Sequence, residues 1–381
     1  MQIIAAVFGT IIIVIILWDA FEAIVLPRRV TRRLRLTSAF FRTTWYPVWA
    51  LAWRTPPSKR RDRYLGFYGP LSLLMLLLVW AVGLILGFAL LQWAFEAELQ
   101  MPGEHERFGT YLYMSGVIFF TLGFGDVVPL EPLGRVIAVI EAGTGFGFLA
   151  IVIGYLPVIY QSFSRREVNI SMLDARAGSP PTALELLRRH SESGSIGKLE
   201  ELLREWEHWS ADLLESHLSY PVLCYYRSQH DNQSWLASLT SILDACALVM
   251  VGVDGVRAWQ AQLTFAMARH AVVDITQILN VRPAAPDKDR LPVEDLARLR
   301  GALARAGITL SDGDGSNDKL EELRQMYEPY VNALACRLLI TLPPWIPAKD
   351  RSDNWQTSAW ERAAKGLHIA PTPKITETEH F

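Results

Sequence analysis

Two glycines stand at alternate positions in one hexapeptide of this sequence, which consists of Thr121, Leu122, Gly123, Phe124, Gly125 and Asp126. Glycine leaves its backbone N–H and C=O groups bare, and lipid cannot hydrogen-bond such groups. At membrane depth, non-helical backbone is tolerated only where it is buried in protein or lines a water-filled path. The hexapeptide is therefore either a loop outside the bilayer or part of a pore.

Three apolar runs surround this hexapeptide or precede it. Residues 2–18 and 65–95 contain no charged residue, and residues 136–164 contain only Glu141. Each run reaches or nearly reaches the ~20 residues with which a helix crosses a ~30 Å hydrocarbon core. Neither a basic segment before the first run nor a small-residue cleavage site after it is present. We therefore expect a membrane helix there, and not a signal peptide.

Lysine and arginine gather in three segments, at 28–35, 59–63 and 165–166. Because positive charge in short loops favours the cytoplasmic side, these clusters predict three membrane spans. The N-terminus then lies outside and the chain beyond residue 165 lies in the cytoplasm, in a multi-pass protein of the cell membrane. Asp19 and Glu22, near the inner end of the first span, are expected to pair with the nearby arginines.

Residues 39–53 are too short for a fourth span, contain Arg42 and Pro47, and have basic segments on both sides. We expect a helix in the membrane interface, because tryptophan favours the headgroup region. The alternative is a helix that packs on its own protein. The tryptophans that would share one face of this helix are Trp45, Trp49 and Trp53.

The segment between the second and third apolar runs has two parts. Glutamates at 96, 98, 104 and 106 make the first part acidic, whereas residues 108–120 are apolar but too short to cross a membrane. A half-length apolar helix followed by a glycine-rich strand describes a re-entrant pore loop.

The hexapeptide resembles the signature of the potassium channel family, T-V/I/L-G-Y/F-G-D, at each position from Thr121 to Asp126. The resemblance covers about residues 65–165. It implies a selectivity filter in which backbone carbonyls replace the hydration shell of K⁺, with Gly123 and Gly125 adopting the unusual dihedrals that glycine permits. It also implies a homotetramer in the lipid bilayer, since one strand supplies one oxygen per layer. K⁺ would be the permeant ion, with no cofactor and no other metal.

The third apolar run resembles the inner helix of that family, with Gly134, Arg135 and Gly145 at matching positions. Glycine and proline allow a helix to bend, so the resemblance implies a gate; the alternative is close packing between small residues. The predicted hinge residues are Gly143, Gly145, Gly154 and Pro157, and the predicted cavity lining is Phe146, Leu149 and Ile153.

Three residues in this region depart from expectation. Phe124 replaces the commoner tyrosine and Phe120 replaces a polar residue, which leaves the rigidity of the filter open. Glu141 is an intramembrane carboxylate, which marks a functional candidate by default. Two roles remain for it: a buried structural partner, or a group that attracts cations or senses pH.

The rest of the chain has a helical pattern without alternating strands. We expect an all-α cytoplasmic domain at 166–366 and a disordered end at 367–381, after an N-terminal helix at 1–27, a basic linker at 28–64 and the pore domain at 65–165. Helices are predicted at 183–190, 197–220, 234–252, 258–279, 294–307 and 318–339.

The sequence favours some functional classes over others. A net charge of −2 gives no sign of nucleic-acid binding, and no nucleophile–base motif suggests an enzyme. We expect an all-α membrane protein that is a potassium-selective channel, modulated by its helical domain and by a small ligand of that domain. The alternative is a membrane-anchored signalling protein whose pore region is a scaffold.

Overall fold

The computed structural model describes residues 2–26, 35–95, 98–100, 107–192, 196–230, 232–253, 256–286, 288–313, 315–348 and 353–356. Of the predicted basic cluster at 28–35, all the arginines except Arg35 lie outside these residues, as do the glutamates at 96, 104 and 106 and the end at 367–381. The chain divides into two units, Met1–Phe163 with Ser216–Tyr226, and Ser164–Glu215 with Arg227–Phe381.

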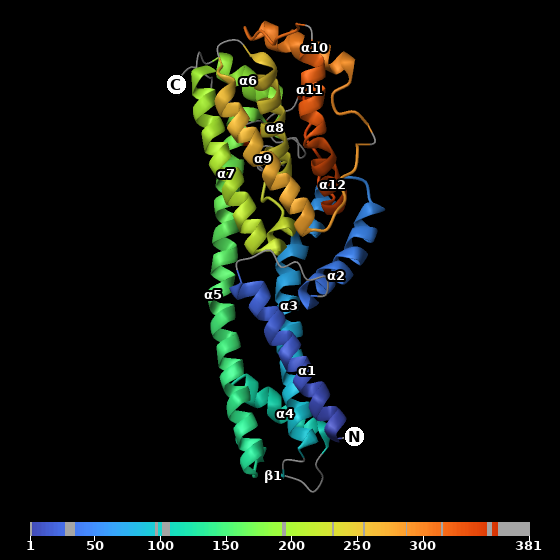
Figure 1. Cartoon of the computed structure of the whole chain (residues 1–381), viewed down its shortest axis with the longest axis vertical. Coiled ribbons are helices and arrows are strands. Elements are labelled where there is room, and N and C mark those ends of the chain that lie inside the picture. The colour runs from blue at the N-terminus through green and yellow to red at the C-terminus, as the bar shows by residue number, and fades with distance from the viewer. Residues whose placement is uncertain are drawn as a thin grey trace, which may run out of the picture. The chain divides into compact units, whose positions relative to one another are not determined.

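In its described residues, the first unit consists of helices and one small pair of strands (Figure 1). In chain order its elements are α1 (Gln2–Ala20), the π-helical turn η1 (Phe21–Val25), α2 (Leu36–Trp53), α3 (Lys59–Ala94), β1 (Leu99–Gln100), α4 (Phe108–Phe119), β2 (Val128–Pro129), most of α5 (Pro132–Ala177) and the 3₁₀ turn η3 (Pro221–Tyr225). The strands pair antiparallel, with Leu99 opposite Pro129.

Helix α1 lies along α3, and small residues allow the two backbones to come close (Figure 1). A Cβ atom added at Gly9 would stand 2.7 Å from the Gly87 carbonyl oxygen, and one at Gly83 would stand 2.3 Å from Ile16. Glycines at such crossings let apolar helices associate by van der Waals contact. Helix α1 is thus an integral part of the first unit.

Buried acids fix the end of α1. Asp19 accepts hydrogen bonds from the Trp80 indole at 3.1 Å and from the Thr37 hydroxyl at 2.6 Å. Glu22 pairs with Arg35 at 3.5 Å, as the expected pairing with a nearby arginine requires. The Thr37 backbone N–H also donates to Asp19 at 3.0 Å, so this carboxylate joins α1 to α2 and α3.

Helix α2 packs on its own protein through one of its three tryptophans. Trp45 is only 2 % exposed, and its ring lies 4.7 Å from that of Tyr68 and 5.0 Å from that of Tyr225. Trp53, stacked on Trp49, is 57 % exposed. The three tryptophans therefore do not share one environment, since Trp45 lies in the protein core and Trp53 lies on the surface.

Four described helices are long and apolar enough to cross a membrane, namely α1 with η1, α3, α5 and α8 (Trp235–Gly252). The rest of the protein buries 28 %, 50 % and 17 % of the apolar part of the first three, but 89 % of that of α8. A helix that is apolar all round and covered by its own protein is a core helix. Helix α8 has this character, since α6, α9, α11 and α12 pack against it.

The second unit is helical too. Besides the end of α5 and α8, it contains α6 (Ala183–Glu192), η2 (Ile196–Lys198), most of α7 (Leu199–Ser219), α9 (Ala258–Ile278), α10 (Val293–Arg305), α11 (Ser316–Gln325), α12 (Glu328–Leu338) and η4 (Asn354–Gln356). The single helix predicted over 318–339 is wrong, because the chain breaks between α11 and α12. Pro329, in the first turn of α12, has no N–H with which to continue α11.

A second difference concerns Ser216–Tyr226. The sequence assigns this segment to the soluble domain, but in the structure it belongs to the first unit. Val222 and Leu223 are buried with Leu73 of α3 and with Ile159 and Phe163 of α5. The apolar side chains of this short turn therefore complete the core around α3 and α5.

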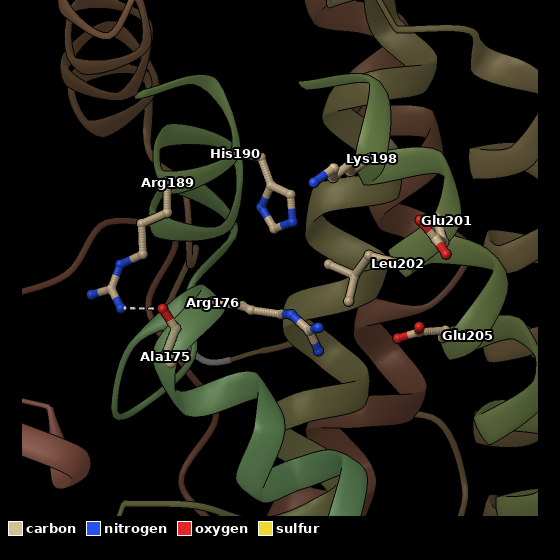
Figure 2. A pocket seen from close by; sticks show the side chains of 8 residues that line it. All are labelled: Ala175, Arg176, Arg189, His190, Lys198, Glu201, Leu202 and Glu205. Carbon is tan, nitrogen blue, oxygen red and sulfur yellow. Dashed lines mark hydrogen bonds between the residues drawn. The ribbon is translucent and has the colours of Figure 1, made fainter. Parts of the chain in front are cut away.

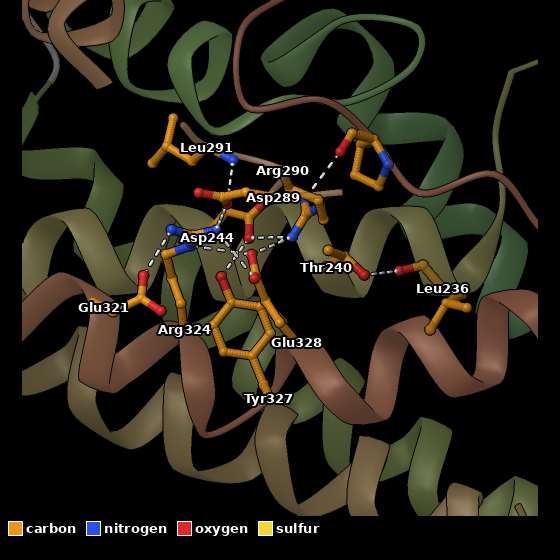
Figure 3. Close-up of polar contacts among 11 residues, drawn as sticks. Leu236, Thr240, Asp244, Asp289, Arg290, Leu291, Glu321, Arg324, Tyr327 and Glu328 are labelled. Carbon is orange, nitrogen blue, oxygen red and sulfur yellow. Dashed lines mark hydrogen bonds and ion pairs between the residues drawn. The ribbon is translucent and has the colours of Figure 1, made fainter. Parts of the chain in front are cut away.

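A network of charged side chains lies in the core of the second unit (Figure 3). Asp244 of α8 is fully buried and pairs with Arg290 at 2.6 Å, while the Tyr327 hydroxyl donates to its other oxygen. Arg290 also contacts Glu328 at 3.1 Å, and Glu328 accepts from Arg324 at 3.2 Å. Burial and the neighbouring Asp244 charge raise the pKa of Tyr327 well above its usual range, so the phenol remains a hydrogen-bond donor.

Removing one member of this network should destabilise the second unit. Asp244→Ala leaves the Arg290 guanidinium, whose side chain is 10 % exposed, without its main partner. We expect the free energy of unfolding to fall by about 3–5 kcal/mol, as for other broken buried pairs. Chemical denaturation of the purified full-length protein, followed by tryptophan fluorescence, measures the change.

The matched control is Asp295→Ala, because Asp295 also pairs with an arginine, Arg298, but on the surface. That change should cost less than about 1 kcal/mol. Equal losses in the two variants would show that the buried network does not carry the stability assigned to it.

Candidate pore loop

The hexapeptide from Thr121 to Asp126 begins where α4 ends, and its first amides are bonded to that helix. The Thr121 N–H donates to the Ile118 carbonyl at 3.0 Å and the Leu122 N–H donates to the Val117 carbonyl at 2.9 Å. The last turn of a helix otherwise leaves its carbonyls without partners. These bonds fix where the loop starts and in which direction it leaves α4.

The backbone of the loop alternates between left-handed and ordinary conformations. Thr121, Gly123 and Gly125 have φ angles of 55°, 62° and 76°, whereas Leu122, Phe124 and Asp126 are not among the residues with positive φ. Glycine adopts positive φ at no steric cost, but a β-branched threonine does not. Such strain costs ~1–3 kcal/mol and persists where the surroundings impose it. Alternation of this kind is what successive carbonyls need to point to one side.

The end of the loop near Asp126 is held by two contacts that the sequence did not predict. The Tyr113 hydroxyl of α4 donates to Asp126 at 2.8 Å, and the Leu130 N–H donates to the Glu98 carbonyl at 2.9 Å beside the β1–β2 pair. Tyr113 is one of the few hydroxyl-bearing residues in this mainly apolar half-helix, and this polarity was the available signal. The chain is therefore restrained both before and after the loop.

Helix α5 meets the end of α4 backbone to backbone at Gly145. A Cβ atom at this position would lie 2.0 Å from the Phe119 carbonyl oxygen, closer than any side chain allows. By contrast, no atom of the described residues lies within 4 Å of such a Cβ at Gly143 or Gly154. Of the predicted hinge residues, Gly145 therefore has a packing role. Helix α5 continues through all of them and through Pro157.

Glu141, one turn before Gly145 on α5, is fully buried and bonds to α4. The Ser115 hydroxyl lies within hydrogen-bond distance of one carboxyl oxygen of Glu141 and 2.7 Å from the Ile85 carbonyl of α3. Among the described residues, the other carboxyl oxygen has no partner. The arrangement joins α3, α4 and α5, which favours the role of structural partner. Sequence reasoning missed Ser115, a small polar residue facing an intramembrane acid.

The predicted cavity residues lie on a part of α5 that the single chain does not fully cover. Phe146 and Ile153 are 69 % and 73 % exposed, while Leu149 is half-buried. In the loop, Leu122 and Phe124 are 55 % and 64 % exposed. Exposed apolar surface of this extent marks contact with lipid or with other protein chains.

The oxygen atoms that the loop offers as ligands are of the kind that hard cations bind. Backbone carbonyls and the Thr121 hydroxyl are oxygen ligands, and the described residues contain no group of three or more His, Cys, Asp or Glu side chains that could hold a metal ion.

Comparison with known proteins places an ion-channel match on this region. Residues 74–161 match a family model described as "Ion channel", and they include most of α3, all of α4, the loop and α5 as far as Gln161. Over 241 residues the chain is 20 % identical to the uncharacterized membrane protein YdjJ of Bacillus subtilis strain 168. The aligned region covers 62 % of this chain and 69 % of that protein. No solved structure matches the chain significantly. The matches support a membrane protein with an ion-channel domain.

The contact at Gly145 predicts a sharp difference between neighbouring glycines. Gly145→Ala forces α5 away from the Phe119 carbonyl and so displaces the start of the loop; we expect loss of at least about nine-tenths of ion flux in liposomes. Gly147→Ala is the matched control, because a Cβ there meets no atom within 4 Å. Similar flux in both variants would contradict the proposed importance of the contact.

Proposed function

We propose that this protein is a potassium-selective channel in which four copies of the chain surround one pore. The observation that carries the proposal is the alternation of positive φ at Thr121, Gly123 and Gly125, inside the segment that matches the ion-channel family. A strand with this alternation can present a column of carbonyl oxygens, which replace the hydration shell of K⁺.

Four chains are needed because one loop supplies one oxygen at each level of the column. The exposed side chains of Leu122, Phe124, Phe146 and Ile153 support such an assembly, since they give the single chain apolar surface next to the loop. Helix α4 points its C-terminal end toward the start of the loop. The partial negative charge at that end would stabilise a cation in the cavity below the filter.

In the proposed topology α1, α3 and α5 cross the membrane, with the N-terminus outside and the second unit in the cytoplasm. Basic residues at the start of α3, and Arg165 and Arg166 in the later part of α5, support this orientation. Helix α5 has 46 residues and is about 69 Å long at 1.5 Å per residue. That is more than twice the ~30 Å hydrocarbon core, so α5 extends into the second unit.

The segment Ser216–Tyr226, which follows the second unit's part of α7 in the chain, is a second connection from that unit to the proposed gate, besides α5 itself. Tyr220 packs on Tyr155 of α5 with ring centroids 5.5 Å apart, and Tyr226 packs on Phe163 of α5 at the same distance. These α5 residues flank Pro157, where the helix lacks one backbone hydrogen bond. A change in the position of this segment would therefore act on α5 beside its weakest point.

The filter assignment is tested by ion flux through purified protein in liposomes. Wild type should conduct K⁺ with a strong preference over Na⁺, and Gly123→Ala should lose that preference or all conduction, because alanine is strained at a φ of 62°. Gly109→Ala, in the first turn of α4, is the control, as its Cβ would meet open space.

Unchanged selectivity in Gly123→Ala would remove the filter assignment. Absence of any ion flux in the wild type would instead favour a membrane-anchored signalling protein with a scaffold pore.

The connection through Ser216–Tyr226 is tested by single-channel recording of Tyr225→Ala. Tyr225 is 6 % exposed and lies between Phe41, Trp45 and Tyr68, so its loss should loosen the segment and change the open probability by about threefold or more while K⁺ selectivity stays. Tyr46→Ala, which removes a 63 % exposed tyrosine from α2, is the control. An open probability equal to wild type in both variants would rule out this connection.

A further inference from the structure

A cavity of about 390 Å³ lies in the second unit (Figure 2). Its walls come from the end of α5, from α6, from the 3₁₀ turn η2 and from the start of α7. The lining residues are Ala175, Arg176, Arg189, His190, Lys198, Glu201, Leu202 and Glu205. A volume of this size falls at the lower end of the ~300–1,000 Å³ that small-molecule sites occupy.

One of the charged residues in the lining is already neutralised. The Arg189 guanidinium lies 2.9 Å from Glu185, 2.8 Å from Asp353 and 2.8 Å from the Ala175 carbonyl, the last contact being drawn in Figure 2. These bonds tie α6 to the end of α5 and to the segment around η4. Arg189 therefore forms a wall of the cavity and is not available as a ligand group.

The other charges are balanced and lie around the cavity. Arg176 and Lys198 are positive, Glu201 and Glu205 are negative, and none of these four side chains forms a hydrogen bond or ion pair with another described residue. Glu201 and Glu205 are four residues apart on α7 and so share one face. Figure 2 shows Arg176 directed from α5 toward the face of α7 that carries Glu205 and Leu202.

His190 adds no charge to this balance at neutral pH. Burial, together with the nearby Arg176 charge, lowers the pKa of His190 below its usual value, although its Nδ1 lies 2.7 Å from the Leu186 carbonyl. The buried side chain of Leu202 supplies an apolar surface between the charged groups.

We propose that this cavity binds a small zwitterion of the α-amino acid class. Its carboxylate would pair with Arg176 and Lys198, its ammonium group with Glu201 and Glu205, and its side chain would lie on Leu202. A simple anion would meet repulsion from the two glutamates, and a simple cation would meet repulsion from Arg176 and Lys198. Specificity of this kind comes from repulsion of the wrong ligand as much as from attraction of the right one.

The position of the cavity gives the ligand a regulatory role, which rests on the proposed channel function. Helices α5 and α7 are two of the places where the chain passes between the units, after Phe163 and after Glu215. A zwitterion held by Arg176 of α5 and by Glu201 and Glu205 of α7 bridges these helices. It shifts the gate by the difference between its affinities for the open and closed states.

Isothermal titration calorimetry on the full-length protein tests binding without reference to conduction. The probes are the standard α-amino acids. For each amino acid that binds, two truncated analogues are also tested: the amine without the carboxylate group, and the carboxylic acid without the amino group. We expect at least one amino acid to bind, and both of its truncated analogues to bind at least about tenfold more weakly. Arg176→Gln and Glu205→Gln should each weaken binding by at least about tenfold.

The matched controls are Arg204→Gln and Glu215→Gln, which remove the same charges from exposed positions of α7 outside the cavity. These variants should bind as wild type does. The proposal is overturned if no amino acid binds, if binding survives both cavity variants, or if inorganic phosphate competes equally well, which would indicate an anion site.

Flux of K⁺ from liposomes separates the two proposals. If K⁺ flux occurs but no amino acid binds, only the amino acid site is rejected. If an amino acid binds but no flux occurs, the channel function is rejected and the binding site is retained. Where both occur, the bound amino acid should change the flux by at least about twofold. Unchanged flux at saturating ligand would overturn the regulatory role.

Discussion

The contact between the backbone of α5 at Gly145 and the carbonyl of Phe119 is the interaction on which the first unit depends. It fixes the end of α4, and that end in turn fixes the loop from Thr121 to Asp126, because the first two amides of the loop bond to the last turn of α4. A half-length helix and a bare loop cannot face lipid, since lipid would leave their polar groups without partners. Close cover by α5 therefore decides whether the loop can exist at membrane depth.

Buried acids hold the helices together where apolar packing alone would let them slide. Asp19 joins α1 to α2 and α3, Glu141 joins α5 to α4, and Asp244 joins α8 to the segments around Arg290 and Tyr327. Each bond has a direction and a fixed length, so it selects one register among the many that apolar surfaces permit. For Asp19 and Asp244 the cost of burying a carboxylate is offset by partners drawn from different elements.

Much of the helical architecture could be predicted from the sequence, and much of its packing could not. Apolar runs and a 3.6-residue period identify helices such as α3 and α7, because the spacing of apolar residues marks the face that is buried. The spacing does not identify the helix that packs against that face. The role of Gly145 as a contact, the bond from Tyr113 to Asp126 and the division of the predicted helix at Pro329 all depend on neighbours distant in the sequence or on one missing N–H. The segment Ser216–Tyr226 was misassigned for the same reason, since a short apolar turn has no period from which to read its partner.

That segment has a consequence for how the protein is made. The core around Leu73, Ile159 and Phe163 is closed by side chains that leave the ribosome only after ~60 further residues, most of which belong to the other unit. At about 5–20 residues per second, the membrane helices wait several seconds with this apolar surface uncovered. The two units therefore cannot complete their folding independently. A chain whose synthesis stops before Tyr226 exposes this apolar surface, which chaperones can bind, until the chain is degraded.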